Sequence, residues 1–241
     1  MIYPADVAAD MELIGAVRAA LRGVAQPELA GPMQAYMKSA TPYLGVRVPV
    51  MRALTRAQAR LRPFAAAEDV ADTVLALWRT ADFREERYAA IALLDTPAAR
   101  RLRDPGLLET QRELIVAGAW WDYVDELAHR VGELLAGWPD DIRPALVTWA
   151  RGGDMWLRRA SIICQLGAGD RTDLELLTLA VEASIGERDF FLRKAIGWAL
   201  RNYARTDPAW VRSFAGTHEL SPLSRREALK HLAPATGAAD H

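Results

Sequence analysis

The stretch WWDYVDELAHRVGELL at residues 120–135 decides the fold class of this chain. Its large apolar residues recur at alternating spacings of four and three residues, which places them on one face of an α-helix. They are Trp120, Val124, Leu127, Val131 and Leu134. A half-buried strand would instead need an apolar residue at every second position. The stretch therefore predicts an amphipathic helix that buries one face.

Segments of the same kind fill the rest of the chain and are separated by Pro, Gly and Asp. Few runs of β-branched residues interrupt them, so we expect an all-α fold. The predicted helices are 6–23, 28–40, 48–61, 67–79, 83–95, 104–118, 120–136, 139–151, 154–167, 172–185, 189–205, 208–216 and 222–232.

The spacing of these helices favours a solenoid of HEAT-like repeats. Helix pairs recur at roughly 35 to 45 residues, which is typical of such repeats. No residue motif repeats at that spacing, so a globular helical bundle is the alternative. No linker or low-complexity tract interrupts the array. We therefore expect one domain over residues 1–241, with a loose tail at 233–241.

Three helix starts carry a local signal. Asp104 and Asp207 each precede a proline, an order typical of a capping acid followed by proline at the first helical position. Thr172 stands three residues before Glu175, which is the spacing of a capping box.

Composition limits the classes of function. The 241 residues carry a formal net charge of -1, so any attraction to nucleic acid must come from clustered charge. The single cysteine, Cys164, excludes an internal disulfide and a cysteine-based zinc site. The N-terminus has acids where a signal peptide needs basic residues, and no window is apolar enough to span a membrane. We expect a cytoplasmic protein that does not bind membranes.

Trp121 and Asp125 lie four residues apart on a helical row beside the apolar stripe. Ala128 and Gly132 continue this row, so another group could approach it closely. One interpretation is that Trp121 packs between repeats and Asp125 pairs with an arginine. The other is a functional site that combines an indole with a carboxylate.

Arg159 falls on an apolar row of its predicted helix, where a guanidinium needs a partner. The partner is either a carboxylate at a repeat junction, with Asp125 as one candidate, or a phosphate in a groove. The sequence leaves both alternatives open.

Trp198 lies off the core stripe of its helix, on a basic row with Lys194 and Arg201. No acidic residue occurs between Phe190 and Arg205. A tryptophan among cations fits a surface that follows a phosphate backbone and stacks on a sugar or base. A hot spot for binding another protein is the alternative.

Several segments together closely resemble the DNA alkylation repair family, the AlkD-like DNA glycosylases. The resemblance runs in order over nearly the whole chain. The segments are PMQAYMKSATPYLGVRVPVMR at 32–52, AGAWWDYVDELA at 117–128, MWLRRASIICQL at 155–166, FFLRKAIGWALRNYARTDP at 190–208 and ELSPLSRREALKHL at 219–232.

The resemblance implies a right-handed, curved array of HEAT-like repeats whose concave basic face holds duplex DNA. It implies excision of purines that carry a positive charge because they are alkylated at N3 or N7, such as 3-methyladenine and 7-methylguanine. No metal and no other cofactor is implied, and we expect a monomer. The alternative is a non-catalytic HEAT-like module that binds DNA or protein.

Residue by residue, the resemblance assigns Trp121, Asp125 and Trp198 to the active centre. Arg159 matches an arginine near the lesion-bearing strand. The remaining positions expected to bind DNA are Tyr36, Arg47, Lys194 and Arg201. Arg47 departs from the family pattern, because its position more often holds a neutral amide.

Overall fold

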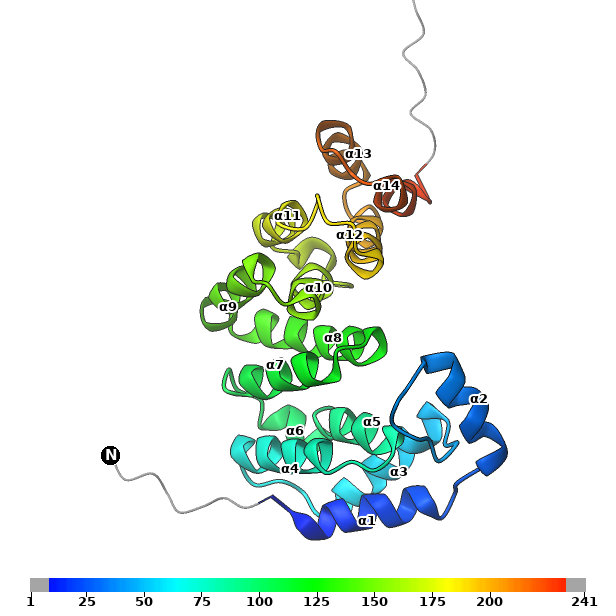
Figure 1. Cartoon of the computed structure of the whole chain (residues 1–241). Helices are drawn as coiled ribbons and strands as arrows, with labels where there is room; N and C mark the ends of the chain where they lie inside the picture. Colours follow the sequence, from blue (N-terminus) through cyan, green and yellow to red (C-terminus); the bar gives the residue numbers. More distant parts are fainter. Residues whose placement is uncertain (1–8, 233–241) are drawn as a thin grey trace, which may run out of the picture. The chain divides into compact units, whose positions relative to one another are not determined.

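The computed structural model describes residues 9–232, which form fourteen α-helices and one 3-10 helix and contain no strand (Figure 1). The all-α fold predicted from the apolar spacing is confirmed. The loose tail predicted at 233–241 lies outside the described residues. The contacts between Cα atoms divide the chain into an N-terminal unit, Met1–Leu114, and a C-terminal unit, Ile115–His241. A single domain over the whole chain stays a prediction.

The N-terminal unit is built from helices α1 to α6 and most of α7. Helix α3 packs against α1 and α5, which are next but one to it in sequence, and α5 also packs against the preceding helix α4. The short helix α6 was missed because five residues are too few to show an apolar period. The bounds are α1 (Met11–Arg22), α2 (Pro27–Met37), α3 (Val48–Leu61), α4 (Ala67–Arg79), α5 (Arg84–Leu93), α6 (Pro97–Arg101) and α7 (Leu107–Gly118).

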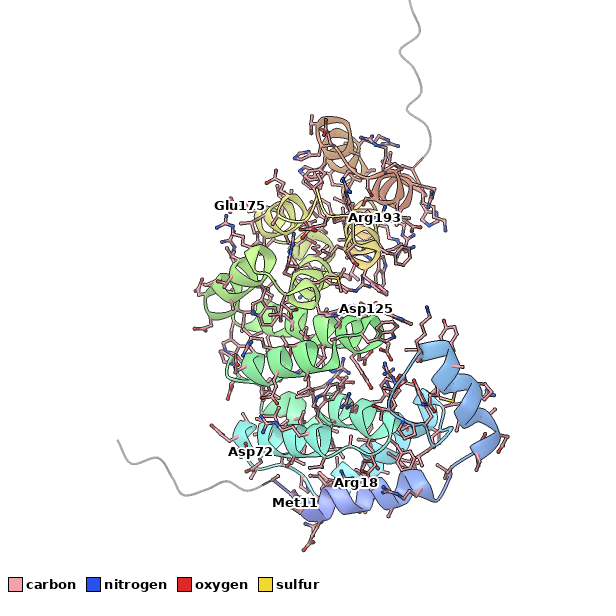
Figure 2. The ribbon with its side chains drawn as sticks, viewed as in Figure 1. Met11, Arg18, Asp72, Asp125, Glu175 and Arg193 are labelled. Carbon is pink, nitrogen blue, oxygen red and sulfur yellow. The ribbon has the colours of Figure 1, made fainter. Side chains whose placement is uncertain are left out.

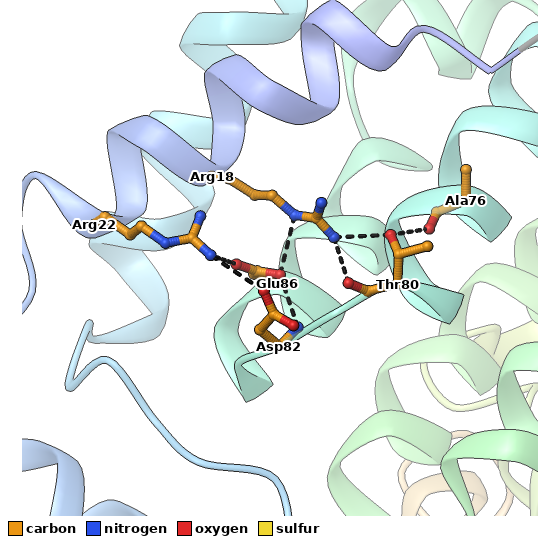
Figure 3. A network of polar contacts seen from close by, with 6 residues as sticks. All are labelled: Arg18, Arg22, Ala76, Thr80, Asp82 and Glu86. Atoms are coloured by element: carbon orange, nitrogen blue, oxygen red, sulfur yellow. Dashed lines mark hydrogen bonds and ion pairs between the residues drawn. The ribbon is translucent and has the colours of Figure 1, made fainter.

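Polar contacts around Glu86 tie α1 to the start of α5 (Figure 3). The Arg18 Nε donates to Glu86 Oε2 at 3.1 Å, and the Arg18 Nη2 donates to the carbonyl oxygen of Thr80 at 2.5 Å. The Arg22 Nη2 lies 3.1 Å from the other carboxylate oxygen, Glu86 Oε1. The Glu86 side chain is fully buried, so two guanidinium partners are needed to offset the loss of its hydration.

A second buried carboxylate, Glu85, holds the loop before α3. Its two oxygens accept hydrogen bonds from the backbone N–H groups of Leu44, Gly45 and Val46 at 2.9 to 3.0 Å. Gly45 has a φ of +82°, and a Cβ there would lie 2.0 Å from the carbonyl oxygen of Gln26. The conformation of this loop therefore fixes the backbone position of Arg47, the residue before α3.

The C-terminal unit contains the remaining helices in two rows. Helices α8, α10, α12 and α14 pack one on the next, while α9 and α11 pack against each other beside them. This neighbour-to-neighbour packing confirms the helical-repeat fold. The bounds are α8 (Trp121–Gly137), α9 (Pro139–Arg151), α10 (Met155–Ile163), the 3-10 helix η1 (Gly169–Arg171), α11 (Leu174–Glu182), α12 (Phe190–Tyr203), α13 (Pro208–Thr217) and α14 (Pro222–Leu229).

The predicted core stripe of α8 is confirmed for four of its five residues, whereas Trp120 is half-buried and directly precedes the helix. Val124, Leu127, Val131 and Leu134 are at most 1% exposed. The adjoining row also has the close neighbour that its small residues indicated, because a Cβ on Gly132 would lie 1.9 Å from the Cys164 carbonyl oxygen after α10. Helices α8 and α10 therefore approach to backbone contact at Gly132.

One predicted cap is confirmed and two are wrong. Asp207 accepts a hydrogen bond from the backbone N–H of Trp210, as expected of an N-cap. Asp173, not Thr172, caps α11. Asp104 accepts from Gly106 in a tight turn, and α7 begins only at Leu107, because the chain winds through this turn before the helix.

Candidate functional site

A cleft of about 400 Å³ lies in the C-terminal unit, where α8, α10 and α12 meet. Six of the eight residues predicted to bind or act on DNA line this cleft. The lining residues are Trp121, Asp125, Arg159, Phe190, Phe191, Lys194, Trp198 and Arg201. The structure thus brings together side chains separated by as many as 80 positions in the sequence, and it adds two phenylalanines that sequence reasoning missed.

Asp125 lies on α8 (Figure 2) and forms a bidentate ion pair with Arg159 of α10. The Arg159 Nε donates to Asp125 Oδ1 at 2.7 Å, and the Arg159 Nη2 donates to Asp125 Oδ2 at 2.9 Å. The Arg159 Nη1 donates to the carbonyl oxygen of Phe191 at 2.6 Å. Of the two kinds of partner that the sequence left open for Arg159, the structure contains the carboxylate, that of Asp125. Contact of Arg159 with a phosphate stays a prediction.

The charge of Asp125 is set by opposing effects. Burial raises the pKa of the Asp125 carboxyl above its ordinary value, and the hydrogen bonds from Arg159 oppose this shift. The negative charge of Asp122 raises the pKa slightly further. Because the guanidinium contacts both oxygens, the ionised carboxylate is the form that this geometry accommodates. The cleft therefore contains a fixed anion that is only partly hydrated.

The basic row on α12 is partly neutralised by an acid from another helix. Glu227 of α14 lies 3.0 Å from the Lys194 ammonium and 2.6 Å from the Arg201 guanidinium. The hydrogen bond from Lys194 is the main reason why the pKa of the Glu227 carboxyl lies below its usual range. The sequence of α12 contains no acid, but α14 supplies one in space.

Aromatic side chains form the remaining wall of the cleft. Trp121 and Trp198 are half-buried and line it from α8 and α12. Phe191 packs edge-on against Trp120 at a distance of 5.8 Å between ring centres and in a tilted arrangement against Trp156 at 5.2 Å. Phe190 is 53% exposed. Both phenylalanines stand in the first turn of α12, where periodicity gave no sign that they face a cleft.

Tyr36 and Arg47 lie in the N-terminal unit and are not part of this cleft. Tyr36 of α2 is 77% exposed, and Arg47 is exposed immediately before α3. Neither side chain forms a hydrogen bond or an ion pair within residues 9–232. Their contact with DNA stays a prediction.

The described residues offer neither a metal site nor a membrane span. Across 9–232, no three His, Cys, Asp or Glu side chains are grouped as ligands for a metal ion. Within the same range no helix has the length and apolarity needed to cross a bilayer.

These features define a class: an all-helical repeat protein whose cleft is lined by a fixed carboxylate, two indoles and several cationic side chains. The family model described as "DNA alkylation repair enzyme" matches residues 17–232, and the chain belongs to this family. The resemblance found in the sequence segments is confirmed. Membership indicates an enzyme of DNA repair with DNA as its substrate.

A solved structure supports the same assignment. It is that of a protein from Enterococcus faecalis described as a predicted DNA alkylation repair enzyme. The two chains are 30% identical, with a TM-score of 0.79 over 88% of this chain and 98% of the other. No curated protein matches this chain.

Proposed function

We propose that this protein is a monofunctional DNA glycosylase, which hydrolyses the N-glycosidic bond of cationic alkylated purines in duplex DNA. Its substrates are 3-methyladenine and 7-methylguanine nucleotides. The observation that carries the proposal is the Asp125 carboxylate, held in an aromatic cleft by two hydrogen bonds from Arg159. We further propose that the protein acts as a monomer, because a repeat array needs no partner to close its core. We propose the cytoplasm as its location.

The charge of the substrate determines what the enzyme must supply. A purine alkylated at N3 or N7 is already cationic, and when the glycosidic bond breaks the electron pair leaves with the base and neutralises it. Positive charge then develops on the deoxyribose. A carboxylate placed beside the sugar stabilises this charge, as in glycoside hydrolysis. Protonation of the leaving base is unnecessary.

Asp125 retains the capacity to act on water. A carboxylate has about four acceptor positions, and Arg159 occupies two of them. A free position can accept a hydrogen bond from a water molecule that attacks C1′ of the sugar. The new C–O bond forms as the water loses its proton to solvent. Arg159 acts as a positioning residue, because its guanidinium fixes the direction of both carboxylate oxygens.

The two indoles suit a cationic substrate. Trp121 and Trp198 line the cleft, and the face of an indole attracts a cation within about 6 Å. Stacking on the deoxyribose or on the lesion would be strengthened by the positive charge and by partial removal of water. Lys194 and Arg201 add positive charge that can attract the phosphate backbone.

The test is release of 7-methylguanine and 3-methyladenine from methylated duplex DNA, corrected for spontaneous release. Asp125→Asn should lower the rate at least about 100-fold, because it removes the charge that stabilises the sugar cation. Its affinity for the duplex should stay within a few-fold of wild type. Asp122→Asn is the matched control, because it removes the same charge from the same helix outside the cleft.

The outcomes separate two classes of function. Release by wild type and by Asp122→Asn, but not by Asp125→Asn, supports the glycosylase. A folded wild type that binds DNA and releases no base refutes it in favour of the non-catalytic HEAT-like module. In that case the tryptophans and the basic row would be a binding surface.

A further inference from the structure

A second cleft, of about 230 Å³, lies in the N-terminal unit between the end of α3 and the start of α6. Arg56 and Arg60 line it from α3, and Arg101 lines it from α6. The other lining residues are small or rigid, including Ala59, Ala98 and the prolines 63 and 97. The lining contains no aspartate or glutamate.

The guanidiniums of Arg56, Arg60 and Arg101 have no partner among the described residues. Within residues 9–232, none of these three side chains forms a hydrogen bond or an ion pair. The nearby acid Asp95 does not neutralise them, because it already pairs with Arg100 at 2.5 Å and lies 3.7 Å from Arg103. The cleft therefore concentrates three positive charges without a counter-charge.

The arrangement on α3 is unfavourable unless something compensates it. Arg56 and Arg60 are four residues apart on one helix, where like charges repel each other. Arg101 brings a third cation to the same opening. A bound anion would relieve this repulsion, since each guanidinium offers parallel N–H donors that match two oxygens of a phosphate.

The backbone around the cleft is already fixed. The Thr96 hydroxyl accepts from the backbone N–H of Ala99 at 3.3 Å and donates to the carbonyl oxygen of Leu93 at 3.0 Å. Pro97 follows directly and fixes the first turn of α6. Binding would therefore need ordering of three side chains but no rearrangement of the chain.

We propose that the Arg56–Arg60–Arg101 cleft binds a phosphate group. The phosphate belongs either to a strand of DNA, bound away from the cleft of Asp125, or to free phosphate or a phosphorylated small molecule. The DNA source rests on the proposed function, whereas the free phosphate source does not. Neither source involves the residues that line the cleft of Asp125.

The first measurement uses inorganic phosphate as the probe. Millimolar phosphate, compared with chloride at equal ionic strength, should raise the Tm of the full-length protein by about 2 to 4 °C. The triple variant Arg56→Gln, Arg60→Gln, Arg101→Gln should lose this shift. Arg151→Gln, which removes an exposed arginine at the end of α9, should keep it. General stabilisation by phosphate would affect all three proteins equally.

The second measurement uses an undamaged DNA duplex. If the cleft holds backbone phosphate, the triple variant should lower the slope of log affinity against log salt by at least about one. Loss of the Tm shift without a change in slope supports free phosphate or a small phosphorylated ligand. Loss of both supports backbone phosphate.

The proposal is overturned if wild type and triple variant agree in both measurements. If the triple variant does not fold, both measurements are made on Arg101→Gln alone, which changes a single exposed side chain. Absence of base release by wild type would refute the proposed glycosylase and leave the phosphate-induced Tm shift as a separate result.

Discussion

The Arg159 guanidinium on α10 and the Asp125 carboxylate on α8 meet edge to edge, with two hydrogen bonds of 2.7 and 2.9 Å. The same guanidinium reaches the Phe191 carbonyl oxygen in the first turn of α12. One side chain thus connects the three helices that form the cleft. The direction in which Asp125 presents its remaining lone pairs depends on Arg159.

Arg159→Lys tests this positioning role. Lysine keeps the positive charge but cannot contact both carboxylate oxygens in one plane. We expect base release to fall on the order of 100-fold, since misplacement of a reacting group by about 1 Å costs that much. Single-turnover release at saturating enzyme measures this effect.

Binding of an undamaged duplex by Arg159→Lys supplies the contrasting measurement. A positioning residue leaves the dependence of affinity on salt unchanged. If Arg159 instead contacts a phosphate, the variant should bind DNA more weakly while its single-turnover release stays near that of wild type. That result would contradict the positioning role.

The pH profile of base release reports the charge of Asp125. Because burial raises the pKa of this carboxyl, the charged form is lost at a higher pH than for an ordinary aspartate, whose pKa is about 3.9. We expect release to decline as the pH falls through this raised pKa and to level off above it. A rate that is constant down to the ordinary pKa of aspartate would show that Asp125 need not be ionised.

Asp122→Asn should move the acid limb of that profile in a defined direction. The negative charge of Asp122 raises the pKa of Asp125, so its removal lowers that pKa. The limb should therefore shift to lower pH, while the rate on the plateau stays near that of wild type. A shift to higher pH would contradict this account.

Apolar spacing was sufficient to predict the helices and the buried stripe of α8. It identified the row of Trp121 and Asp125 because a helical row follows directly from the sequence. It could not choose a partner for Arg159, since the carboxylate lies 34 positions earlier in the chain. Periodicity tells which face of a helix a residue occupies, but not which helix packs against that face.

The same limit explains why the sequence did not predict the contacts of Glu227 or the position of the two phenylalanines in the cleft. The segment 190–205 contains no acid, yet Glu227 reaches Lys194 because α12 and α14 pack closely. A Cβ on Gly197 would lie 2.5 Å from the Glu227 Cβ, so the approach depends on a glycine. The place of Phe190 in the cleft was not predicted, because a residue in the first turn of a helix belongs to no complete apolar stripe.

Glu227→Gln should strengthen binding of duplex DNA. The substitution leaves Lys194 and Arg201 without their shared carboxylate, so their charges become available to phosphate. We expect affinity to rise several-fold at low ionic strength and the salt dependence to become steeper. Affinity measured over a range of salt checks both effects. Unchanged affinity would mean that these two cations do not face the DNA.

The same variant should alter stability at acidic pH. The folded-state pKa of Glu227 lies below its unfolded value, so the wild type gains stability above about pH 4.5 and loses it as the pH falls through the lowered pKa. Glu227→Gln should lack this part of the acid dependence. Tm measured between pH 3 and pH 7 compares the two proteins.

Gly132→Ala tests whether the close approach of α8 and α10 is required. The new Cβ would lie 1.9 Å from the Cys164 carbonyl oxygen, so the helices must separate. We expect the free energy of unfolding to fall by about 1 to 3 kcal/mol, the usual cost of overpacking. Separation would also move Arg159 away from Asp125 and lower base release. Urea unfolding and single-turnover release measure the two effects.

Gly137→Ala is the control in the same helix. Apart from the chain neighbours and the nearby backbone of α8, no described heavy atom lies within 4 Å of a Cβ built on Gly137, so alanine adds no clash there. It should leave stability unchanged or raise it by about 0.5 kcal/mol, because glycine loses more freedom in a helix than alanine does. If Gly132→Ala and Gly137→Ala behave alike in both assays, the backbone contact at Gly132 does not determine the spacing between Asp125 and Arg159.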